Sequence, residues 1–399
     1  MRYKKSKQFA AEGNGIQVPI NLMLITNIIV LLLSACSSIA ASGPTSPVAA
    51  TSTSSPITPS STTTPSGGVT NPNPIPLFAY YYIWFDASSW ERAKKDYPIL
   101  GPYSSDDIVI MRQHIQWAKA AGIQGFIVSW KSTDKLNNRL DQLIKVADEQ
   151  NFKLAIIYQG LDFNRNPLPV AQVAADLDYF IDHYSKDTAF DKYEKPVVIW
   201  SGTWEFSRDE VAGVTQKRRD RLLILASEKN VGGFQRVADL VDGDAYYWSS
   251  VNPDTFPKYP EKLAAMGQAV HTQGGLWIAP AAPGFDAQLL NKKTIVDRKD
   301  GETLRKEMQA ALQSSPDMIG LISWNEFSEN SHIEPSGKYG HFYLDLLTNI
   351  KRAGIPILAG DFDSSDSGID TVMNTGGQFA VGLIAAIIIV SGITLIRRH

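Results

Sequence analysis

Cysteine is almost missing from this chain, whose 399 residues contain only Cys36. A single cysteine cannot form an intrachain disulfide, and it cannot supply the several thiolates of a structural zinc site. The sequence also has no His-x-x-x-His pair and no Gly-x-Ser-x-Gly stretch. It therefore lacks the zinc-binding helix of many metalloproteases and the nucleophile turn of the α/β-hydrolases.

An excess of charge of one sign is also missing. Lysine and arginine number 38 against 41 aspartate and glutamate residues, which gives a formal net charge of -3. Proteins that bind nucleic acid or charged polymers usually show a strong imbalance. We therefore expect no nucleic-acid partner, and we expect a monomer that works without a cofactor or a metal ion.

Residues 1–36 have the pattern of a bacterial export signal. A basic start with Lys4, Lys5 and Lys7 precedes an apolar run, residues 20–35, that is short for a membrane span. The run ends in Leu33-Ser34-Ala35-Cys36, which resembles the lipobox of bacterial lipoproteins. We predict that residues 1–36 are a lipoprotein signal peptide and that Cys36 is lipidated. The alternative is an ordinary signal-peptidase site with an incidental cysteine.

Two further segments suggest how the protein is tethered. Residues 37–73 are rich in serine, threonine and proline and have almost nothing to bury, so we predict a disordered linker. After a polar spacer, residues 360–378, the uncharged apolar run 379–396 precedes two arginines. The run can just cross a bilayer, and such positive flanks stay on the cytoplasmic side. We predict a transmembrane helix and a membrane-anchored domain at the cell surface. A buried core helix and a processed sorting signal are the alternatives.

Residues 74–359 have the pattern of one (β/α)8 barrel, an α/β fold. Short apolar runs alternate with longer amphipathic segments, which is typical of parallel strands joined by helices. The expected strands are 77–82, 125–129, 153–158, 196–200, 222–226, 244–248, 275–279 and 318–323. The fifth of these could instead be the end of a helix. We expect a helix capped by Ser105 and further helices at 302–313 and 339–353.

Aromatic and polar residues gather where these expected strands end. Barrels of this kind place their chemistry at the C-terminal ends of the strands, and aromatic rings offer flat apolar surfaces for sugars. We therefore predict an aromatic cup with carboxylates at its edge. Its expected substrate-binding residues are Tyr81, Tyr82, Trp84, Trp130, Tyr158, Gln159, Tyr247, Asn325 and His332. Each aromatic residue, taken alone, could instead be a packing residue.

Glu326 and Glu329 follow the last expected strand and lie three residues apart, near enough for both carboxyls to face one space. Two carboxyls in different surroundings can act as an acid and a base, and cleavage of a glycosidic bond uses such a pair. We predict that both are catalytic. One alternative is that the acidic segment only solvates a loop. Another is a metal site with His332 and Glu334, although a lone histidine among carboxylates is a weak ligand set.

The stretch ISWNEFSENSHIEPS, residues 322–336, resembles the end of the barrel in glycoside hydrolase family 99 and its family 71-like relatives. Similar stretches are YYIWF at 81–85, GPYSSDD at 101–107, AGIQGFIVSWKS at 121–132 and APGFD at 282–286. The resemblance implies a barrel enzyme that hydrolyses an α-linked glycan. It also implies that Glu326 assists attack by the sugar's own 2-hydroxyl, and that Glu329 is the acid and base at the glycosidic oxygen.

Two departures from the family pattern bear on the substrate. Phe327-Ser328-Glu329-Asn330 stands where the family usually has Trp-His-Glu-Gly, and Gln159 stands where it often has an acidic residue. α-Mannan and α-glucan therefore remain equal possibilities. The other possible function is that of a non-catalytic carbohydrate-binding protein on the same barrel, which would not need two acids at this spacing.

The lipobox interpretation is tested by Cys36→Ala. The full chain, expressed in a bacterium fed labelled fatty acid, should lose its label because the thiol is the atom that is acylated. Ser37→Ala serves as the control and should keep the label. Unchanged labelling of Cys36→Ala would remove the lipidation claim.

Overall fold

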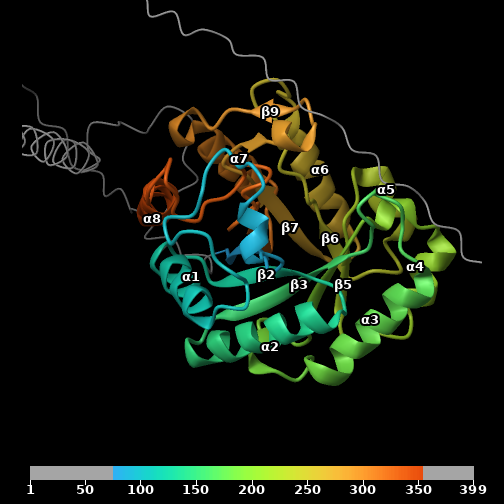
Figure 1. Ribbon diagram of the computed structural model, residues 1–399. Helices are drawn as coiled ribbons and strands as arrows, with labels where there is room; N and C mark the ends of the chain where they lie inside the picture. Colours follow the sequence, from blue (N-terminus) through green and yellow to red (C-terminus); the bar gives the residue numbers. More distant parts are fainter. Residues whose placement is uncertain (1–74, 354–399) are drawn as a thin grey trace, which may run out of the picture. The chain divides into compact units, whose positions relative to one another are not determined.

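The apolar runs of the sequence become the strands of one closed barrel. The computed structural model describes residues 75–353. Within this range, eight parallel strands close in the order β1-β10-β7-β6-β5-β4-β3-β2, with helices around them (Figure 1). The (β/α)8 prediction is therefore confirmed.

The eight barrel strands are β1 (Leu77–Tyr82), β2 (Gly125–Trp130), β3 (Lys153–Gln159), β4 (Val197–Ser201), β5 (Leu223–Ala226), β6 (Gly243–Ala245), β7 (Leu276–Ala281) and β10 (Met318–Leu321). The helices are α1 (Ile108–Ala120), α2 (Asp134–Glu149), α3 (Val170–His183), α4 (Arg208–Thr215), α5 (Val231–Val237), α6 (Tyr259–Thr272), α7 (Glu302–Gln313) and α8 (Phe342–Ala353). The fifth apolar run is thus a strand and not the end of a helix.

Each strand divides its side chains between two cores. Along β1, Phe78, Tyr80 and Tyr82 join the core inside the barrel, whereas Ala79 and Tyr81 join the core between the strands and the helices. The division follows from the two-residue period of a β-strand. Of two neighbouring residues in one strand, only one can therefore face the interior.

Glycines make room for the rings inside the barrel. A Cβ atom on Gly125 of β2 would lie 2.3 Å from the ring of Phe78, and one on Gly320 of β10 would lie 2.7 Å from the ring of Tyr80. Such distances are far shorter than van der Waals contact, so both positions require glycine. The aromatic residues of β1 can therefore fill the barrel axis.

Two predicted boundaries were wrong for identifiable reasons. The cap of α1 is Asp107, whose carboxylate accepts the Val109 N–H at 2.8 Å. Ser105 is buried, and its hydroxyl accepts the Phe85 N–H at 3.1 Å instead. The expected strand 244–248 ends as β6 at Ala245, and the aromatic residues after it belong to the following loop.

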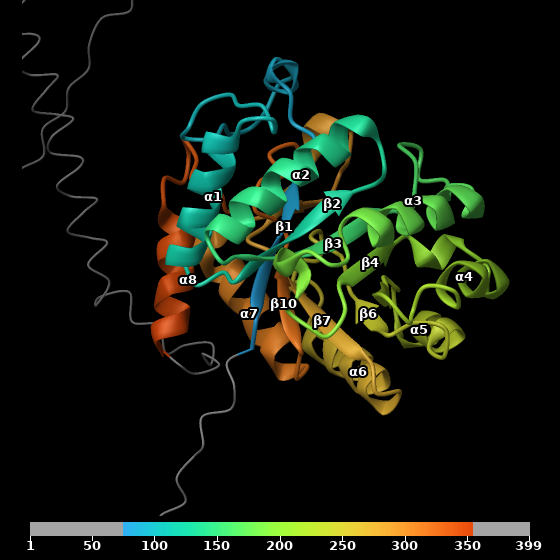
Figure 2. The same cartoon turned by 90° about the horizontal axis from the view of Figure 1, so that it is seen from below.

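Long loops lie at the C-terminal end of the strands, where β1 points upward in Figure 2. The loop between β1 and α1 contains the short helix η1 (Ala87–Trp90). The loop between β7 and α7 contains an antiparallel pair, β8 (Phe285–Asp286) and β9 (Ile295–Val296). Lys95 joins the two loops, because its ammonium donates to Asp286 and, at 2.7 Å, to Gln288 Oε1.

Several predictions fall on residues outside the described range. They are the signal peptide 1–36 with Cys36, the linker 37–73, the spacer 360–378 and the apolar run 379–396. Within residues 75–353, no helix combines the length and the apolar character that crossing a membrane requires.

Candidate active site

The loop that follows β10 folds back on itself and holds both glutamates. Ser323 N–H donates to the Ser331 carbonyl at 2.8 Å, and the Ile333 N–H donates to the Ser323 carbonyl at 2.9 Å. Inside this closed loop, the Glu326 N–H donates to Ser323 Oγ at 2.9 Å. These hydrogen bonds thus fix the positions of Glu326 and Glu329 on the loop after β10.

Asn325 attaches this loop to β1. Its side-chain oxygen accepts the Tyr82 N–H at 2.8 Å, and its side-chain nitrogen donates to the Tyr82 carbonyl at 3.0 Å. The same nitrogen lies 3.2 Å from the Tyr103 hydroxyl. Asn325 is fully buried. It therefore positions the loop, which corrects the expectation that it binds substrate.

A buried hydrogen-bond network holds Asn325 in place. The Tyr103 hydroxyl donates to Glu334 at 2.9 Å, and the other oxygen of Glu334 lies 3.1 Å from His114 Nε2. The network ends at the Tyr81 hydroxyl, which lies 3.0 Å from His114 Nδ1. Glu334, the third glutamate of the acidic segment, therefore has a structural role. Tyr81 belongs to this buried network and does not line the predicted aromatic cup.

Glu326 sits in an environment that opposes its negative charge. The residue is only 6% exposed, and its carboxyl accepts the Ser328 N–H at 2.9 Å. Burial, with the nearby charge of Glu329, raises the pKa of Glu326 to about 8. At neutral pH the protein without substrate therefore keeps a proton on Glu326.

Glu329 is half-buried on the same loop. Burial raises its pKa, while the positive charges of Arg165 and Lys292 pull the pKa down. The two carboxyls therefore have different charged neighbours, because Lys94 lies near Glu326 whereas Arg165 and Lys292 lie near Glu329. Two carboxyls with unequal surroundings are what acid–base chemistry requires.

Tyr82 and Tyr247 complete the space around the pair. Their hydroxyls are hydrogen-bonded to each other. The pKa values of both tyrosines are raised mainly by burial, and the charges of Glu326 and Glu329 add to the shift. The structure thus brings two predicted binding residues to the predicted catalytic pair.

Two other predicted binding residues lie at the same end of the barrel. The ring of Trp84 stacks on Tyr82 with centroids 4.4 Å apart, and Trp84 is 41% exposed. Gln159 ends β3 on its inward-facing side, where its amide donates to Ser129 Oγ at 3.0 Å. Both have surface available for a ligand.

The predicted binding roles of Trp130 and Tyr158 are wrong, because both side chains are buried. Trp130 and Tyr158 lie on the outer face of their strands and are fully buried. The Trp130 indole donates to Asn137 at 3.0 Å, and the Tyr158 hydroxyl donates to Asp176 at 2.9 Å. These rings pack between strands and helices and cannot line a groove.

His332 is also a structural residue. It is 1% exposed, its ring stacks on Phe327 at 3.9 Å, and its Nε2 lies 3.1 Å from Asp96. Burial lowers the pKa of His332 to about 4. It is therefore neutral near pH 7, and it joins the β10 loop to the β1–α1 loop instead of meeting a ligand.

The side chains of His332 and Glu334 do not support the alternative of a metal site. His332 bonds to Asp96, whereas Glu334 bonds to Tyr103 and His114. Among residues 75–353, no three histidine, cysteine or acidic side chains are arranged to hold a metal ion.

Sequence reasoning missed the cations around the pair and the partners of Asn325. Arg165 and Lys292 lie in loops without a recognisable pattern, so no signal pointed to them. Tyr103 lies in the quoted stretch GPYSSDD, and Glu334 was recognised as part of the acidic segment. Their roles depend on contacts between distant segments, which the sequence does not reveal.

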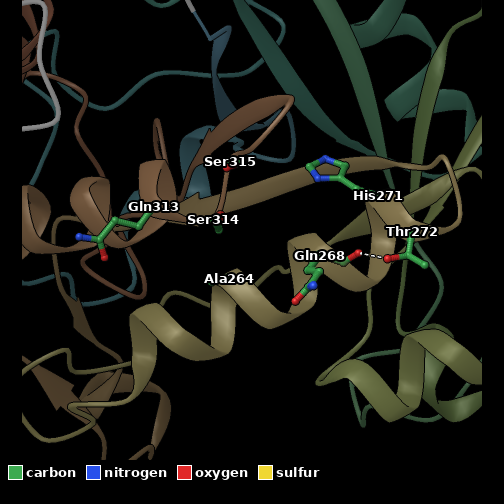
Figure 3. Close-up of a pocket in the computed structure, with 7 residues that line it drawn as sticks. All are labelled: Ala264, Gln268, His271, Thr272, Gln313, Ser314 and Ser315. Carbon is green, nitrogen blue, oxygen red and sulfur yellow. Dashed lines mark hydrogen bonds between the residues drawn. The ribbon is translucent and has the colours of Figure 1, made fainter.

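A polar hollow at the other end of the barrel is separate from this site. It has a volume of about 430 Å³ and is lined by the end of α6 and the turn after α7, where Gln268, Thr272 and Ser314 lie (Figure 3). Both segments precede the first residues of strands β7 and β10. The hollow therefore lies at the end opposite the glutamates.

The sequence matches the model of one family, described as "Glycosyl hydrolase family 99", over residues 86–346. A mouse "Glycoprotein endo-alpha-1,2-mannosidase-like protein" is 24% identical over 279 residues, which are 63% of this chain and 61% of the relative. A mouse "Glycoprotein endo-alpha-1,2-mannosidase" is 25% identical, with 62% of this chain and 59% of the relative covered. The chain thus spans about three fifths of the length of these curated relatives.

Among solved structures, the fold resembles a GH99 endo-alpha-mannosidase from Bacteroides thetaiotaomicron. The TM-score is 0.61 with 19% identity, over 70% of this chain and 97% of that one. At this identity the likeness concerns the fold.

The buried carboxyl predicts how stability depends on pH. The folded protein holds a proton on Glu326 up to about pH 8, whereas an exposed glutamate loses it near 4.5. Stability from this group is therefore complete below about pH 4.5 and is lost as the pH rises toward 8. Glu326→Gln should remove that loss, so the free energy of unfolding of the variant minus that of the wild type should rise by up to about 1.4 kcal/mol per pH unit between pH 5 and 8.

Urea unfolding at several pH values measures this difference. Glu149→Gln serves as the control, because Glu149 is an exposed glutamate at the end of α2. A difference that stays constant with pH would show that Glu326 ionises normally in the folded state.

Proposed function

The chain belongs to glycosyl hydrolase family 99, and we propose from this premise that its barrel hydrolyses the glycosidic bonds of an α-linked glycan. The observation that supports the proposal is the pair Glu326 and Glu329. Both lie on one closed loop at the C-terminal end of the strands, beside the hydrogen-bonded Tyr82 and Tyr247. A structural loop would gain nothing from placing a buried carboxyl beside a second, half-buried one.

The two glutamates are assigned different roles. In the first step, the Glu326 carboxylate takes the proton of the sugar's 2-hydroxyl as that oxygen attacks C1. Glu329, as an acid, gives its proton to the departing glycosidic oxygen, and a 1,2-anhydro sugar forms. In the second step, Glu329 takes a proton from water, which attacks C1, and Glu326 returns its proton to O2. Neither glutamate becomes bonded to the sugar, unlike the nucleophile of the ordinary retaining scheme.

These roles require the proton to change place when substrate binds. Without substrate, the raised pKa of Glu326 favours the proton there. A sugar hydroxyl that donates to Glu326 favours its ionised form, whereas a sugar that covers half-buried Glu329 favours the neutral acid. Substrate binding thus prepares both groups for the first step.

Tyr82, Trp84, Tyr247 and Gln159 are proposed to bind the sugar. The exposed face of Trp84 can cover the C–H surface of a pyranose ring, which is worth roughly 1 kcal/mol for each aromatic contact. The names of the mouse relatives indicate an α-1,2-linked mannoside, and we propose α-mannan as one candidate substrate. α-Glucan is an equal candidate, because Gln159 places an amide where the family often has a carboxylate and so alters the expected sugar site.

The enzyme is proposed to work outside the cell membrane. The apolar and basic pattern of residues 1–36, the lipobox cysteine and the apolar run 379–396 support this location. The barrel would then be held at the cell surface by a lipid, by a helix or by both.

Amide replacements separate the two roles. Glu329→Gln should nearly abolish turnover of natural glycans, since an amide cannot protonate a sugar leaving group. It should spare aryl or fluoride glycosides, which leave without an acid. Glu326→Gln should lower turnover of both kinds by about 100- to 10,000-fold, the usual contribution of a general acid or base. Rates on matched natural and activated substrates measure the asymmetry, with Glu149→Gln on α2 as the control.

Equal losses on both substrate kinds would contradict the assigned roles. Losses of only a few-fold in either variant would leave the acidic segment as a solvated loop and favour a carbohydrate-binding protein without catalysis.

A further inference from the structure

We propose that a second sugar-binding subsite, formed by Trp204, Trp248, Lys229 and Arg165, takes a sugar unit with an acidic substituent, a phosphate or a carboxylate. The inference rests on the proposed function, because it names a class of substrate for the same end of the barrel. We call these four residues the cationic platform.

The cationic platform comes from four successive loops at the C-terminal end of the barrel. Arg165 follows β3, Trp204 lies in the short helix η3 (Thr203–Glu205) after β4, Lys229 follows β5 and Trp248 follows β6. These loops lead into α3, α4, α5 and α6, which are neighbours in Figure 1. The chain therefore gathers these residues at the end of the barrel where the glutamates lie.

The two indoles offer an angled apolar surface. Their centroids are 5.4 Å apart and their planes are inclined by 52°. Both residues are only half-buried, so part of each ring stays accessible. Angled aromatic faces of this kind can hold the C–H patches of a pyranose ring.

Two cations lie over these rings. Lys229 Nζ is 4.6 Å from the centroid of Trp204 and 5.9 Å from that of Trp248. The guanidinium carbon of Arg165 is 5.9 Å from the Trp204 centroid. Cation–π contacts orient the charged groups without using their N–H donors in hydrogen bonds.

Within residues 75–353, most of these donors have no carboxylate partner in an ion pair. Among residues 75–353, the guanidinium of Arg165 forms no ion pair. Lys229 lies 4.0 Å from exposed Glu205, and its buried chain neighbour Glu228 pairs with Arg236 instead. Asp162, on the Arg165 loop, accepts the N–H groups of Asn164 and Asn166, both at 2.8 Å. A phosphate or carboxylate could therefore form charge-assisted hydrogen bonds with both cations, which a neutral sugar cannot do.

The cationic platform adjoins the catalytic pair. Tyr247 bonds to Tyr82 beside the glutamates, whereas the next residue, Trp248, packs with Trp204 against the outer core. Arg165 is the member of the cationic platform that connects the two places. The charge of Arg165 also reaches this space, where it lowers the pKa values of Glu329 and Tyr247. A sugar chain that fills the catalytic site can therefore extend over the indoles.

Binding to the full-length Glu329→Gln protein tests the proposal, since calorimetry reports affinity whether or not the chain is an enzyme. The probes are three α-linked oligosaccharides with the same backbone: neutral, with one phosphate monoester, and with one uronic acid. An acidic probe should bind more tightly than the neutral one. Adding Lys229→Met should weaken its binding by about ten-fold, and that of the neutral probe by less than about two-fold. The probe with the larger loss identifies the acidic group.

Two further variants serve as controls. Lys229→Arg keeps the charge and should keep the preference for the acidic probe. Lys338→Met removes a lysine that lies 5.1 Å from the Tyr339 ring, away from the cationic platform, and should change neither affinity. Equal affinity for all probes, or equal losses on acidic and neutral probes in Lys229→Met, would overturn the proposal. Failure of catalysis with the charge preference intact would instead count against the proposed hydrolase alone.

Discussion

The hydrogen bonds between Asn325 and the backbone of Tyr82 are the interaction on which the site depends. They occupy both the N–H and the carbonyl of Tyr82, at 2.8 and 3.0 Å. One side chain thus joins the first and last strands of the barrel where the catalytic loop begins. Tyr103, Glu334 and His114 then fix Asn325 in a buried network. A buried network with its members paired is the kind that specifies a single geometry.

This constraint explains how the fold can bury Glu326. A carboxyl taken from water disfavours its charged form, and the neighbouring Glu329 adds repulsion. The loop cannot relieve either effect by moving outward, because its ends are joined to each other and to β1. The cost appears as the raised pKa of Glu326. Strongly shifted carboxyls of this kind are concentrated at functional sites.

The sequence predicted the fold well because apolar runs alternate with amphipathic segments along the whole barrel. All eight strands were expected, and β1 begins and ends at the predicted residues. The face of each residue was harder to predict, since strands buried on both sides lack a polar alternation. Tyr81 and Tyr82 were both placed in the cup, although neighbours in a strand face opposite cores. Trp130 and Tyr158 were misplaced for the same reason.

The acidic pair was visible because two glutamates directly follow a buried run. Asn325 and His332 were recognised as belonging to this site, but their role as supports depends on Tyr82 and Asp96, more than 200 residues away in the chain. Arg165 and the indoles of the cationic platform come from separate loops that only the closed barrel brings together.

The most direct test of the central claim is the configuration of the first product. Attack by the 2-hydroxyl followed by attack of water inverts the anomeric carbon twice, so the α configuration is retained. Proton NMR during the first minutes of hydrolysis, before the sugar mutarotates, shows which anomer is released. The account predicts the α-anomer from the wild-type protein. Initial release of the β-anomer would contradict it, because a single inversion leaves no role for an anhydro sugar or for attack by the 2-hydroxyl that Glu326 is proposed to assist.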